Sequence, residues 1–301
     1  MTYAAHLVGT AVACHLLAMV LLRSTWTWRS PRVAIISWQA IGLALGLCAI
    51  GLPMSIGLAP YREGLADSLL HLGRDLLHGT LPAGLGVTQL ALVGIGFGVA
   101  AALLGSTVRG LVSAVRAQTR HRQLLDLVGR DDPAAPGALV LDHPSAAAYC
   151  LPGMRPTVVV SAGTLDLLDR SELAAVLTHE RAHADERHDL VLLPFTALCR
   201  ALPLVGWLRR ASETVALLVE MRADDKARRL HAEGPLANAL LRFATAGSRV
   251  APAGALGLAD AHLDARVQRL LVVGPRPWLH GLASLTVATT LVALPVTLFF
   301  A

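Results

Sequence analysis

The sequence has few charged and few aromatic residues for its length. Of its 301 residues, 16% are Asp, Glu, Lys or Arg and 4% are Phe, Trp or Tyr, whereas 54% are hydrophobic. A soluble domain carries about 25% charged residues, so a soluble protein built around a large aromatic core is disfavoured. The many Leu, Ala, Val and Gly residues instead favour helices that face lipid.

Cysteine is also scarce. The four cysteines are widely spaced and include no Cys-x-x-Cys pair. They are Cys14, Cys48, Cys150 and Cys199. Neither a disulfide scaffold nor a thiolate zinc knuckle is therefore indicated. Two of the four lie inside apolar stretches, where cysteine usually behaves as a small buried hydrophobic residue.

The net charge of +5 comes almost entirely from arginine. The arginines follow apolar stretches and do not cluster with aromatic residues or a recognition motif. This distribution is typical of membrane orientation and not of nucleic-acid binding. We therefore expect the lipid bilayer as a partner and no direct binding to nucleic acid.

Four stretches without any Asp, Glu, Lys or Arg are long enough to cross a bilayer, namely Tyr3–Leu22, Val33–Pro60, Leu81–Val108 and Gly281–Ala301. We predict three transmembrane helices within residues 1–108, at about 3–22, 33–57 and 84–108, and a fourth at 281–301. Leu190–Leu208 is also apolar, but an arginine at mid-bilayer, here Arg200, costs at least about 2.5 kcal/mol. We expect that segment to form buried or membrane-skimming helices within the soluble domain.

Arginines near the ends of the predicted spans set their orientation. The first loop contains Arg23, Arg29 and Arg32, and the stretch after the third span begins with Arg109, Arg116, Arg120 and Arg122. The fourth span is preceded by Arg266, Arg269 and Arg276. We therefore predict a multi-pass plasma-membrane protein in which residues 109–280 are cytoplasmic and both termini are extracytoplasmic.

Residues 109–280 are predicted to form a mainly helical α+β domain between the third and fourth spans. The third helix continues to Val128 and is broken by "DDPAAPG", Asp131–Gly137. Three short apolar runs bounded by Pro and Gly predict a small sheet of hairpins: "ALVLDHP", "AAAYCLPG" and "PTVVVSAG". Helices follow from Ser171, with Asp169 or Ser171 as the N-cap.

The stretch "VLTHERAHADERHDL", Val176–Leu190, carries the candidate chemistry. His179 and His183 are four residues apart, so on a helix they lie on one face with about 5–6 Å between their Cβ atoms. Two imidazoles at this spacing can both bind one Zn²⁺. Glu180 projects toward the open coordination position, where a carboxylate can take a proton from water. This is the His-Glu-x-x-His arrangement of zinc metallopeptidases.

A catalytic zinc site also needs a third protein ligand. We predict it on the later helix "LLVEMRADDKARR", Leu217–Arg229, where Glu220 follows an apolar run that would hold it against the first helix. Asp224, one turn further on, faces the same way and can accept the second N–H of a ligand histidine. One Zn²⁺ per chain is therefore expected on His179, His183 and Glu220.

The other polar residues of the stretch are assigned different roles. His188 lies about 140° from His183 around an unbroken helix, so we place it off the metal-binding face with a structural role. Asp185–Arg187 are expected to form the solvated face of the helix.

Two further features concern the substrate. The strand at Ala146–Cys150 is expected to pair with an extended substrate by β-augmentation. Tyr149 and His231 are both candidates for stabilising an oxyanion, and the sequence does not distinguish between them.

The runs "LAAVLTHERAHADERHDLVLL" and "VEMRADDKARR", preceded by "VLDHPSAAAYCLPGMRPTVVVSAGTLDLL", resemble the BlaR/MecR family of integral-membrane zinc peptidases. It resembles in particular short actinobacterial-like members without a penicillin-binding sensor, because an end at Ala301 leaves no room for such a domain. The resemblance extends over nearly the whole chain and implies three helices, a cytoplasmic gluzincin-like domain and a fourth helix. It implies the zinc ligands His179, His183 and Glu220, the general base Glu180, and Asp224 as partner of a ligand histidine.

The resemblance implies a zinc metalloendopeptidase, a hydrolase that cleaves a cytoplasmic protein in signal transduction. Its substrate would be a winged-helix transcriptional repressor of the BlaI/MecI type. The alternative is a membrane quality-control protease of the HtpX type, although such sequences usually have two membrane spans between the two motifs and Arg200 argues against them. A third hypothesis is a non-catalytic zinc-binding membrane receptor or scaffold. Self-association into a homo-oligomer is left open.

Overall fold

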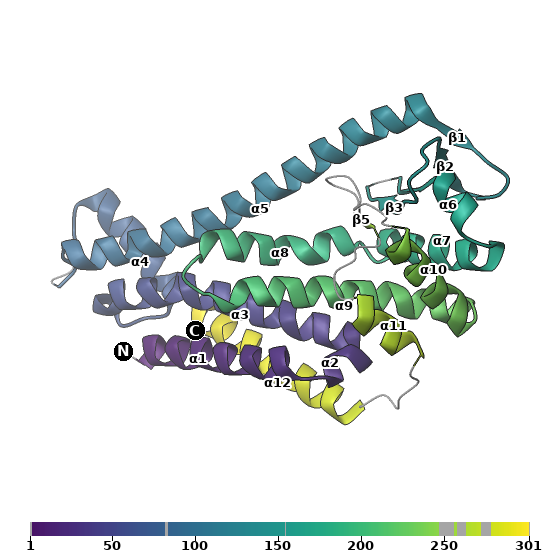
Figure 1. Cartoon of the computed structure of the whole chain (residues 1–301). Coiled ribbons are helices and arrows are strands. Elements are labelled where there is room, and N and C mark those ends of the chain that lie inside the picture. Colours follow the sequence, from purple (N-terminus) through teal and green to yellow (C-terminus); the bar gives the residue numbers. More distant parts are fainter. Residues whose placement is uncertain are drawn as a thin grey trace. The chain divides into compact units, whose positions relative to one another are not determined.

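The computed structural model describes residues 2–81, 84–153, 155–246, 256–257, 263–271 and 278–300 (Figure 1). These residues form two compact units. Unit 1 is drawn from Met1–Val108, Pro194–Ser212 and Pro277–Ala301, and unit 2 from Arg109–Leu193 and Glu213–Arg276. Arg276 and Ala301, which the sequence predictions use, lie outside the described residues.

Unit 1 is built from long apolar helices. Its elements are α1 Thr2–Arg23, α2 Trp26–Arg29, α3 Pro31–Gly57, the 3-10 turn η1 Ala59–Tyr61, α4 Leu65–His78, the first part of α5 Val87–Val128, and α12 Trp278–Phe300. In the described part of the chain, four helical stretches are long and apolar enough to cross a membrane: Tyr3–Arg23, Pro31–Gly57, Val87–Val128 and Gly281–Phe299. Each predicted span overlaps one of them.

Small side chains let the helices of unit 1 approach closely. α3 packs against α1 and α12. At Gly51 of α3, an added Cβ would lie 3.0 Å from the Phe299 ring and 3.2 Å from Leu7. The hydroxyls of Ser37 and Ser284 are 2.7 Å apart and join α3 to α12 by a buried hydrogen bond. Close packing and interhelical hydrogen bonds of this type hold helices together in lipid, where hydrophobic burial contributes little.

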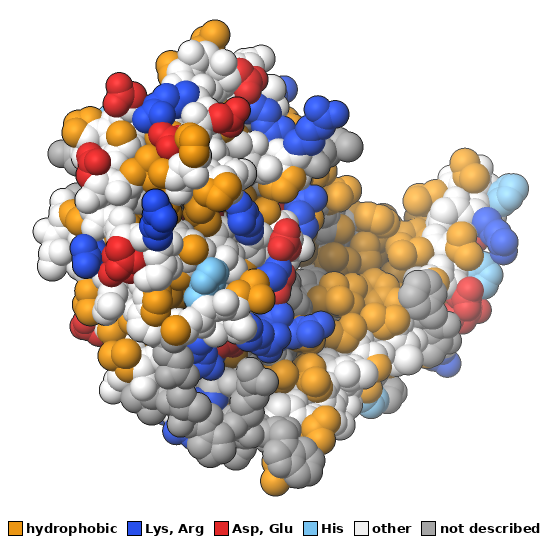
Figure 2. Space-filling model, turned by 90° about the vertical axis from the view of Figure 1, so that its right-hand side faces the viewer, with side chains coloured by type: hydrophobic (Ala, Val, Ile, Leu, Met, Phe, Trp, Pro, Cys, Tyr) orange, Lys and Arg blue, Asp and Glu red, His pale blue; other side chains and the backbone are white. Residues whose placement is uncertain are grey.

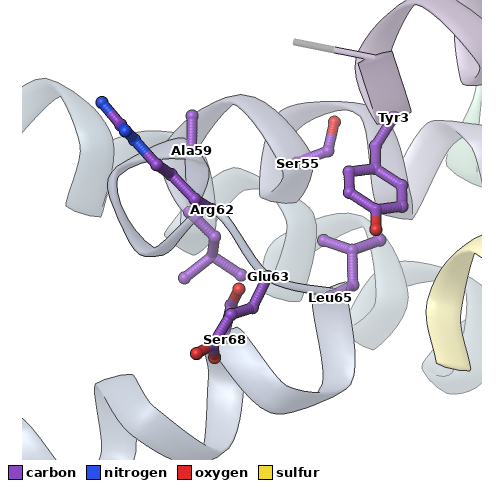
Figure 3. A pocket seen from close by; sticks show the side chains of 8 residues that line it. Tyr3, Ser55, Ala59, Arg62, Glu63, Leu65 and Ser68 are labelled. Atoms are coloured by element: carbon purple, nitrogen blue, oxygen red, sulfur yellow. The ribbon is translucent and has the colours of Figure 1, made fainter. Parts of the chain in front are cut away.

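The predicted loop between the second and third spans contains the helix α4. Its residues Leu65 and Leu72 are buried in one cluster with Met54 from the last turns of α3. A cavity of about 240 Å³ in unit 1 is lined by Tyr3, Ser55, Arg62, Glu63 and Ser68, among others (Figure 3). The predicted site residues are not among its lining residues.

The apolar segment Leu190–Leu208 packs differently from the prediction. It lies in α8, His188–Ala201, and the start of α9, Trp207–Leu230. From Pro194 to Ser212 the chain belongs to unit 1, together with the long apolar helices. Leu198 is buried there, 3.0 Å from the position that a Cβ on Gly42 would take. Arg200 itself is exposed.

Unit 2 contains a five-stranded sheet in the described residues, in the order β1-β2-β4-β3-β5. The strands are β1 Gly129–Asp131, β2 Ala138–Leu141, β3 Ala148–Leu151, β4 Thr157–Ser161 and β5 Leu256–Gly257. The predicted continuation of the third helix is confirmed, since α5 runs unbroken to Val128. The prediction of successive hairpins is wrong for β2, which pairs parallel with β4. Residues 142–147 carry the chain past β4, so β3 is added on its far side.

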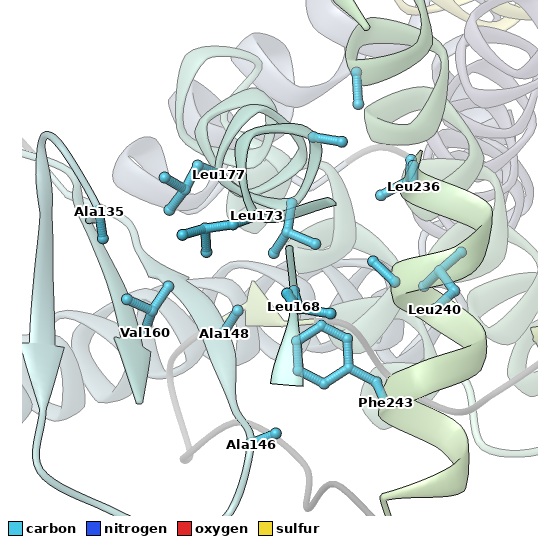
Figure 4. Packing of buried hydrophobic residues seen from close by; sticks show 14 of the residues in the cluster. Ala135, Ala146, Ala148, Val160, Leu168, Leu173, Leu177, Leu236, Leu240 and Phe243 are labelled. Atoms are coloured by element: carbon cyan, nitrogen blue, oxygen red, sulfur yellow. The ribbon is translucent and has the colours of Figure 1, made fainter. Parts of the chain in front are cut away.

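Helices cover both faces of this sheet, and successive strand residues alternate between them. On one face Ala148 and Val160 pack in a cluster with α7, Arg170–Asp185, and with Phe243 of α10, Glu233–Thr245 (Figure 4). On the other face Tyr149 clusters with Leu125 of α5. The short helix α6, Ala162–Leu167, follows β4 directly. β3 is thus buried on both faces and fixed between α5 and α7.

Candidate metal centre

Helix α7 carries three of the predicted site residues, and a capping box anchors its start. The Asp169 carboxylate accepts hydrogen bonds from the backbone N–H groups of Ser171 and Glu172, and the Glu172 carboxylate accepts one from the Asp169 N–H. Asp169 is therefore the N-cap, one of the two residues that the sequence predicted. Packing on the sheet determines which face of α7 is buried. The fully buried polar residues of α7 are His179, Glu180 and His183.

His179, His183 and Glu220 come together although Glu220 lies on α9. The Nε2 atoms of the two histidines are 3.1 Å apart. Glu220 places Oε2 3.4 Å from Nε2 of His179 and Oε1 3.5 Å from Nε2 of His183. Atoms bound at about 2.0–2.1 Å to a tetrahedral Zn²⁺ are separated by about 3.3–3.4 Å. The spacing of these donors fits one metal ion, and the group could hold one.

Asp224 lies beside His179, with its Oδ1 3.0 Å from His179 Nδ1. Arg266, on α11 Leu263–Leu271, donates two hydrogen bonds of 2.7 and 3.0 Å to the Asp224 carboxylate. The same guanidinium places Nη1 3.1 Å from Glu220 Oε2. Asp224 and Arg266 are both completely buried. One cation thus compensates two buried carboxylates, and one of these, Asp224, lies beside the second nitrogen of His179.

Arg266 was not predicted from the sequence as a site residue, only as a basic flank of the fourth span. A signal was available, because Arg266 precedes the buried Leu270 by four residues and therefore lies on the same face of the amphipathic helix α11. A buried arginine needs anionic partners. The carboxylates of "LLVEMRADDKARR" were the natural candidates.

The charges of the cluster compensate one another. Burial lowers the pKa of His179, but its contacts with Asp224 and Glu220 outweigh burial and raise that pKa to about 9. At His183 burial prevails and lowers the pKa to about 3. Burial raises the pKa of Glu220, yet the neighbouring histidines and Arg266 bring it down to about 2. The extra proton shared by the two facing imidazoles therefore stays on His179, which is cationic, while His183 is neutral. Glu220 remains ionised.

Glu180 differs from the other carboxylates of the cluster because it lacks a compensating cation at close range. The residue is fully buried, and burial raises its pKa to about 8. Apart from a weak interaction with the backbone N–H of Cys150, neither carboxylate oxygen has a hydrogen-bond partner in the described part of the chain. A buried carboxylate is costly without a partner. Two imidazoles, one ionised carboxylate and this unpartnered carboxylate fit a zinc ion with its reactive water.

Residues 114–249 match the family model described as Peptidase family M48. This segment is therefore similar to M48 peptidases. The family is zinc-dependent, and the matched residues include every predicted ligand as well as Glu180 and Asp224. Together, this match and the long apolar helices point toward a membrane-associated metallopeptidase. No solved structure matches the chain significantly.

The helix that carries His179 and His183 ends before His188, so the angle of about 140° that holds on an unbroken helix does not apply. α7 ends at Asp185, and a new helix, α8, begins at His188. His188 is 2% exposed, and its ring packs edge-on against that of His183. Asp185 and Arg187 are exposed as expected, whereas Glu186 is half-buried and paired with Arg222.

Both candidate oxyanion residues make contacts outside the metal cluster. The Tyr149 hydroxyl lies 2.7 Å from Nε2 of His121 on the α5 face of the sheet, and burial raises the pKa of Tyr149 to about 12. His231 places Nε2 2.7 Å from the hydroxyl of Thr178. Neither side chain joins His179, His183 and Glu220 in this structure.

The edge of β3 that was expected to receive a substrate is occupied. β4 pairs along one side of β3. On the other side β5 pairs antiparallel, with Tyr149 opposite Gly257 and Cys150 opposite Leu256. β5 also contacts α7. A peptide that pairs with this stretch of β3 therefore has to displace β5.

Charged side chains of both signs lie next to one another on the face shown in Figure 2. In unit 2 such pairs include Lys226 with Asp185, whose charged atoms are 2.6 Å apart. Exposed ion pairs contribute at most about 1 kcal/mol. They are features of a solvated surface, in contrast to the buried charges around Arg266.

Proposed function

We propose that the chain is a membrane-embedded zinc endopeptidase in which His179, His183 and Glu220 hold one Zn²⁺ and Glu180 is the general base. One observation carries the proposal: three donor atoms lie 3.1–3.5 Å apart beside a buried carboxylate without a partner. A purely structural zinc site needs a fourth protein ligand. The nearest further histidine, His188, faces Nδ1 of His183 and not its Nε2, which argues against a non-catalytic receptor or scaffold.

When bound, zinc polarises the scissile carbonyl and lowers the pKa of a water molecule. Glu180 then accepts the proton of this water and delivers it to the departing amine. Burial raises the pKa of Glu180 above that of an ordinary carboxyl, which favours its holding the proton between these two steps. Asp224 keeps Nδ1 of His179 engaged, so that Nε2 points to the metal.

Arg266 has a separate role in this scheme. Burial raises the pKa of Asp224, but the charge of Arg266 outweighs it and holds that pKa far below its ordinary range. Asp224 therefore stays ionised and can stabilise hydrogen on Nδ1 of His179. Arg266 itself touches no reacting atom and acts through its two carboxylate partners.

The proposed location is a multi-pass plasma membrane, with the M48 domain in the cytoplasm and both termini outside. Support comes from arginines at the inner ends of the helices, since α1 ends at Arg23 and α2 at Arg29, and α5 passes from its apolar part into Arg109. An alkaline phosphatase reporter fused after Ala301 tests this orientation. It should be active, and an inactive reporter would reverse the topology.

The proposed substrate is a cytoplasmic winged-helix repressor of the BlaI/MecI type, cleaved when a signal reaches the membrane part. The resemblance of the runs around His179 and Glu220 to BlaR/MecR peptidases supports this choice. Cleavage of such a repressor would change transcription.

A second function, quality control of membrane proteins in the manner of HtpX-type proteases, is favoured by a specific observation. Between the two zinc motifs, Pro194–Ser212 belongs to unit 1, where HtpX-type sequences have two spans. However, α8 has 14 residues and is about 21 Å long, too short for a hydrocarbon core of about 30 Å. We therefore rank this function second.

The decisive experiment compares the parent protein with Glu180→Gln, both purified in detergent. Bound zinc is measured first, and then cleavage of a candidate repressor and of an unfolded model protein. Glu180→Gln should keep its zinc and lose cleavage, whereas the control Glu213→Gln, at an exposed site on α9, should cleave like the parent. Equal activity of Glu180→Gln and the parent would refute the mechanism. Cleavage of the unfolded protein alone would favour quality control.

A further inference from the structure

His188 directly follows the turn that ends α7. Glu186 is the C-cap of α7, and Arg187 has a left-handed backbone conformation, with φ at 49°. Few residues other than glycine adopt this conformation. The chain changes direction there before α8 begins at His188. As a result the His188 side chain turns back toward α7 and is 2% exposed, instead of lying about 140° away from His183.

The buried imidazole of His188 makes two polar contacts. Its Nδ1 lies 2.9 Å from Nδ1 of His183, and the two rings are nearly perpendicular, at 83°. Its Nε2 lies 3.5 Å from Oε2 of Glu186. Glu186 in turn accepts two hydrogen bonds of 2.8 Å each from Arg222. The second histidine of the motif is therefore followed by a chain of three polar side chains that ends in a fixed guanidinium.

These contacts determine where the hydrogens lie when Nε2 of His183 binds metal. Nδ1 is then the His183 nitrogen that carries a hydrogen, and Nδ1 of His188 has to accept it. The hydrogen of His188 is consequently on Nε2, beside the carboxylate of Glu186, which favours that tautomer. Arg222 keeps Glu186 in place. Each member of the chain thus orients the one before it.

We propose that His188 is a positioning residue for the metal ligand His183, supported by Glu186 and Arg222. It has the same relation to His183 as Asp224 has to His179, whose Nδ1 is 3.0 Å from Asp224. The inference rests on the proposed function, because it requires His183 to bind zinc through Nε2. It extends the functional motif five residues beyond His183, to the first residue of α8.

The test measures the dissociation constant for Zn²⁺ of the full chain in detergent, by competition with a chromophoric chelator. His188→Phe keeps a ring but removes the acceptor, and should weaken zinc binding about 10–100-fold, as loss of a hydrogen-bond partner of a ligand histidine does. His188→Asn offers an amide oxygen near the position of Nδ1 and should recover most of the affinity. His231→Phe, a half-buried histidine on Thr178, is the matched control and should bind like the parent.

The melting temperature of the zinc-free proteins is measured in parallel, because a purely structural role would lower it and leave the zinc affinity unchanged. If His188→Phe does not fold, Arg222→Met decides, since it leaves both rings in place and should weaken zinc binding in the same direction. If His188→Phe folds and binds zinc as tightly as the parent, the proposal is overturned. If His188→Phe does not fold, a parent-like zinc affinity of Arg222→Met overturns it. A parent that binds zinc but cleaves nothing overturns only the endopeptidase, and a parent that binds no zinc overturns both.

Discussion

The two units bury polar groups in opposite ways. In unit 1 buried hydroxyls bond to carbonyls of their own helix, as Thr10 does to His6 and Ser37 to Val33, and neighbouring helices meet at glycines. In unit 2 charged side chains are buried together and compensate one another through Arg266. Stability of unit 1 therefore depends on shape and that of unit 2 on charge balance.

The largest effect is expected from Arg266→Met, which leaves the carboxylates of Asp224 and Glu220 buried without their cation. Removing one partner of a buried ion pair costs about 3–5 kcal/mol. Calorimetry of the zinc-free full chain in detergent measures the loss. The control Arg228→Met removes a looser pair, 3.7 Å from Asp225, and should cost less than about 1 kcal/mol. Small and equal losses in both variants would show that charge balance does not stabilise unit 2.

The corresponding change in unit 1 is Gly57→Ala. The added Cβ would lie 2.6 Å from the backbone oxygen of Gln89 and 2.8 Å from a methyl group of Val93, so α3 and α5 would have to separate. Overpacking of this kind costs about 1–3 kcal/mol.

Gly94→Ala on α5 is the matched control, because nothing lies within 4 Å of the new Cβ. It should be neutral or stabilise the helix by up to about 1 kcal/mol. The thermal midpoints of the two variants in detergent measure the difference. Equal midpoints would mean that close approach of helices is not what stabilises unit 1.

Zinc affinity should depend on pH through His179. Its pKa of about 9 in the metal-free protein lies above the ordinary value for histidine, so zinc has to displace a proton at any lower pH. The apparent affinity should rise about tenfold per pH unit between pH 7 and 9 and level off above that.

Asp224→Asn supplies the control for this prediction. It removes a charge that raises the pKa of His179, so the levelling should begin at a lower pH. Chelator competition at several pH values measures both curves. A parent whose affinity is constant from pH 7 to 9 would contradict the assignment of the shared proton to His179.

The smallest effect is expected from Lys226→Met, at the surface of unit 2. Lys226 and Asp185 are paired at 2.6 Å but both are substantially exposed. The loss should stay below about 1 kcal/mol and shrink further when salt is added, because exposed charges are screened. A loss as large as that of Arg266→Met would mean that surface pairs stabilise unit 2 as much as buried ones.

The sequence predicted those features that depend on spacing along one helix. The apolar stretches became helices, and the i to i+4 spacing of His179 and His183 placed both rings together. Glu220 could be found as well, because a carboxylate that follows an apolar helix face has to be directed to a buried partner. Asp169 was one of two predicted N-caps, and the capping box with Glu172 selects it.

Features that depend on a change of chain direction could not be predicted in this way. The left-handed conformation of Arg187 breaks the helix, so the angular argument that removed His188 from the site did not apply. β3 passes to the far side of β4, which no local pattern of alternation encodes. Arg266 and β5 reach the site from parts of the sequence that are far from its motifs.

The pairing of β5 with β3 makes substrate recognition a competition. Any peptide that uses Tyr149 and Cys150 as its template binds only in the fraction of molecules in which Leu256 and Gly257 have left that edge. Its apparent affinity is reduced by that fraction. Peptides that bind weakly and are met at random would then rarely displace β5, whereas proteins held nearby at high local concentration would do so more often. Selectivity can therefore arise without a specific side-chain pocket.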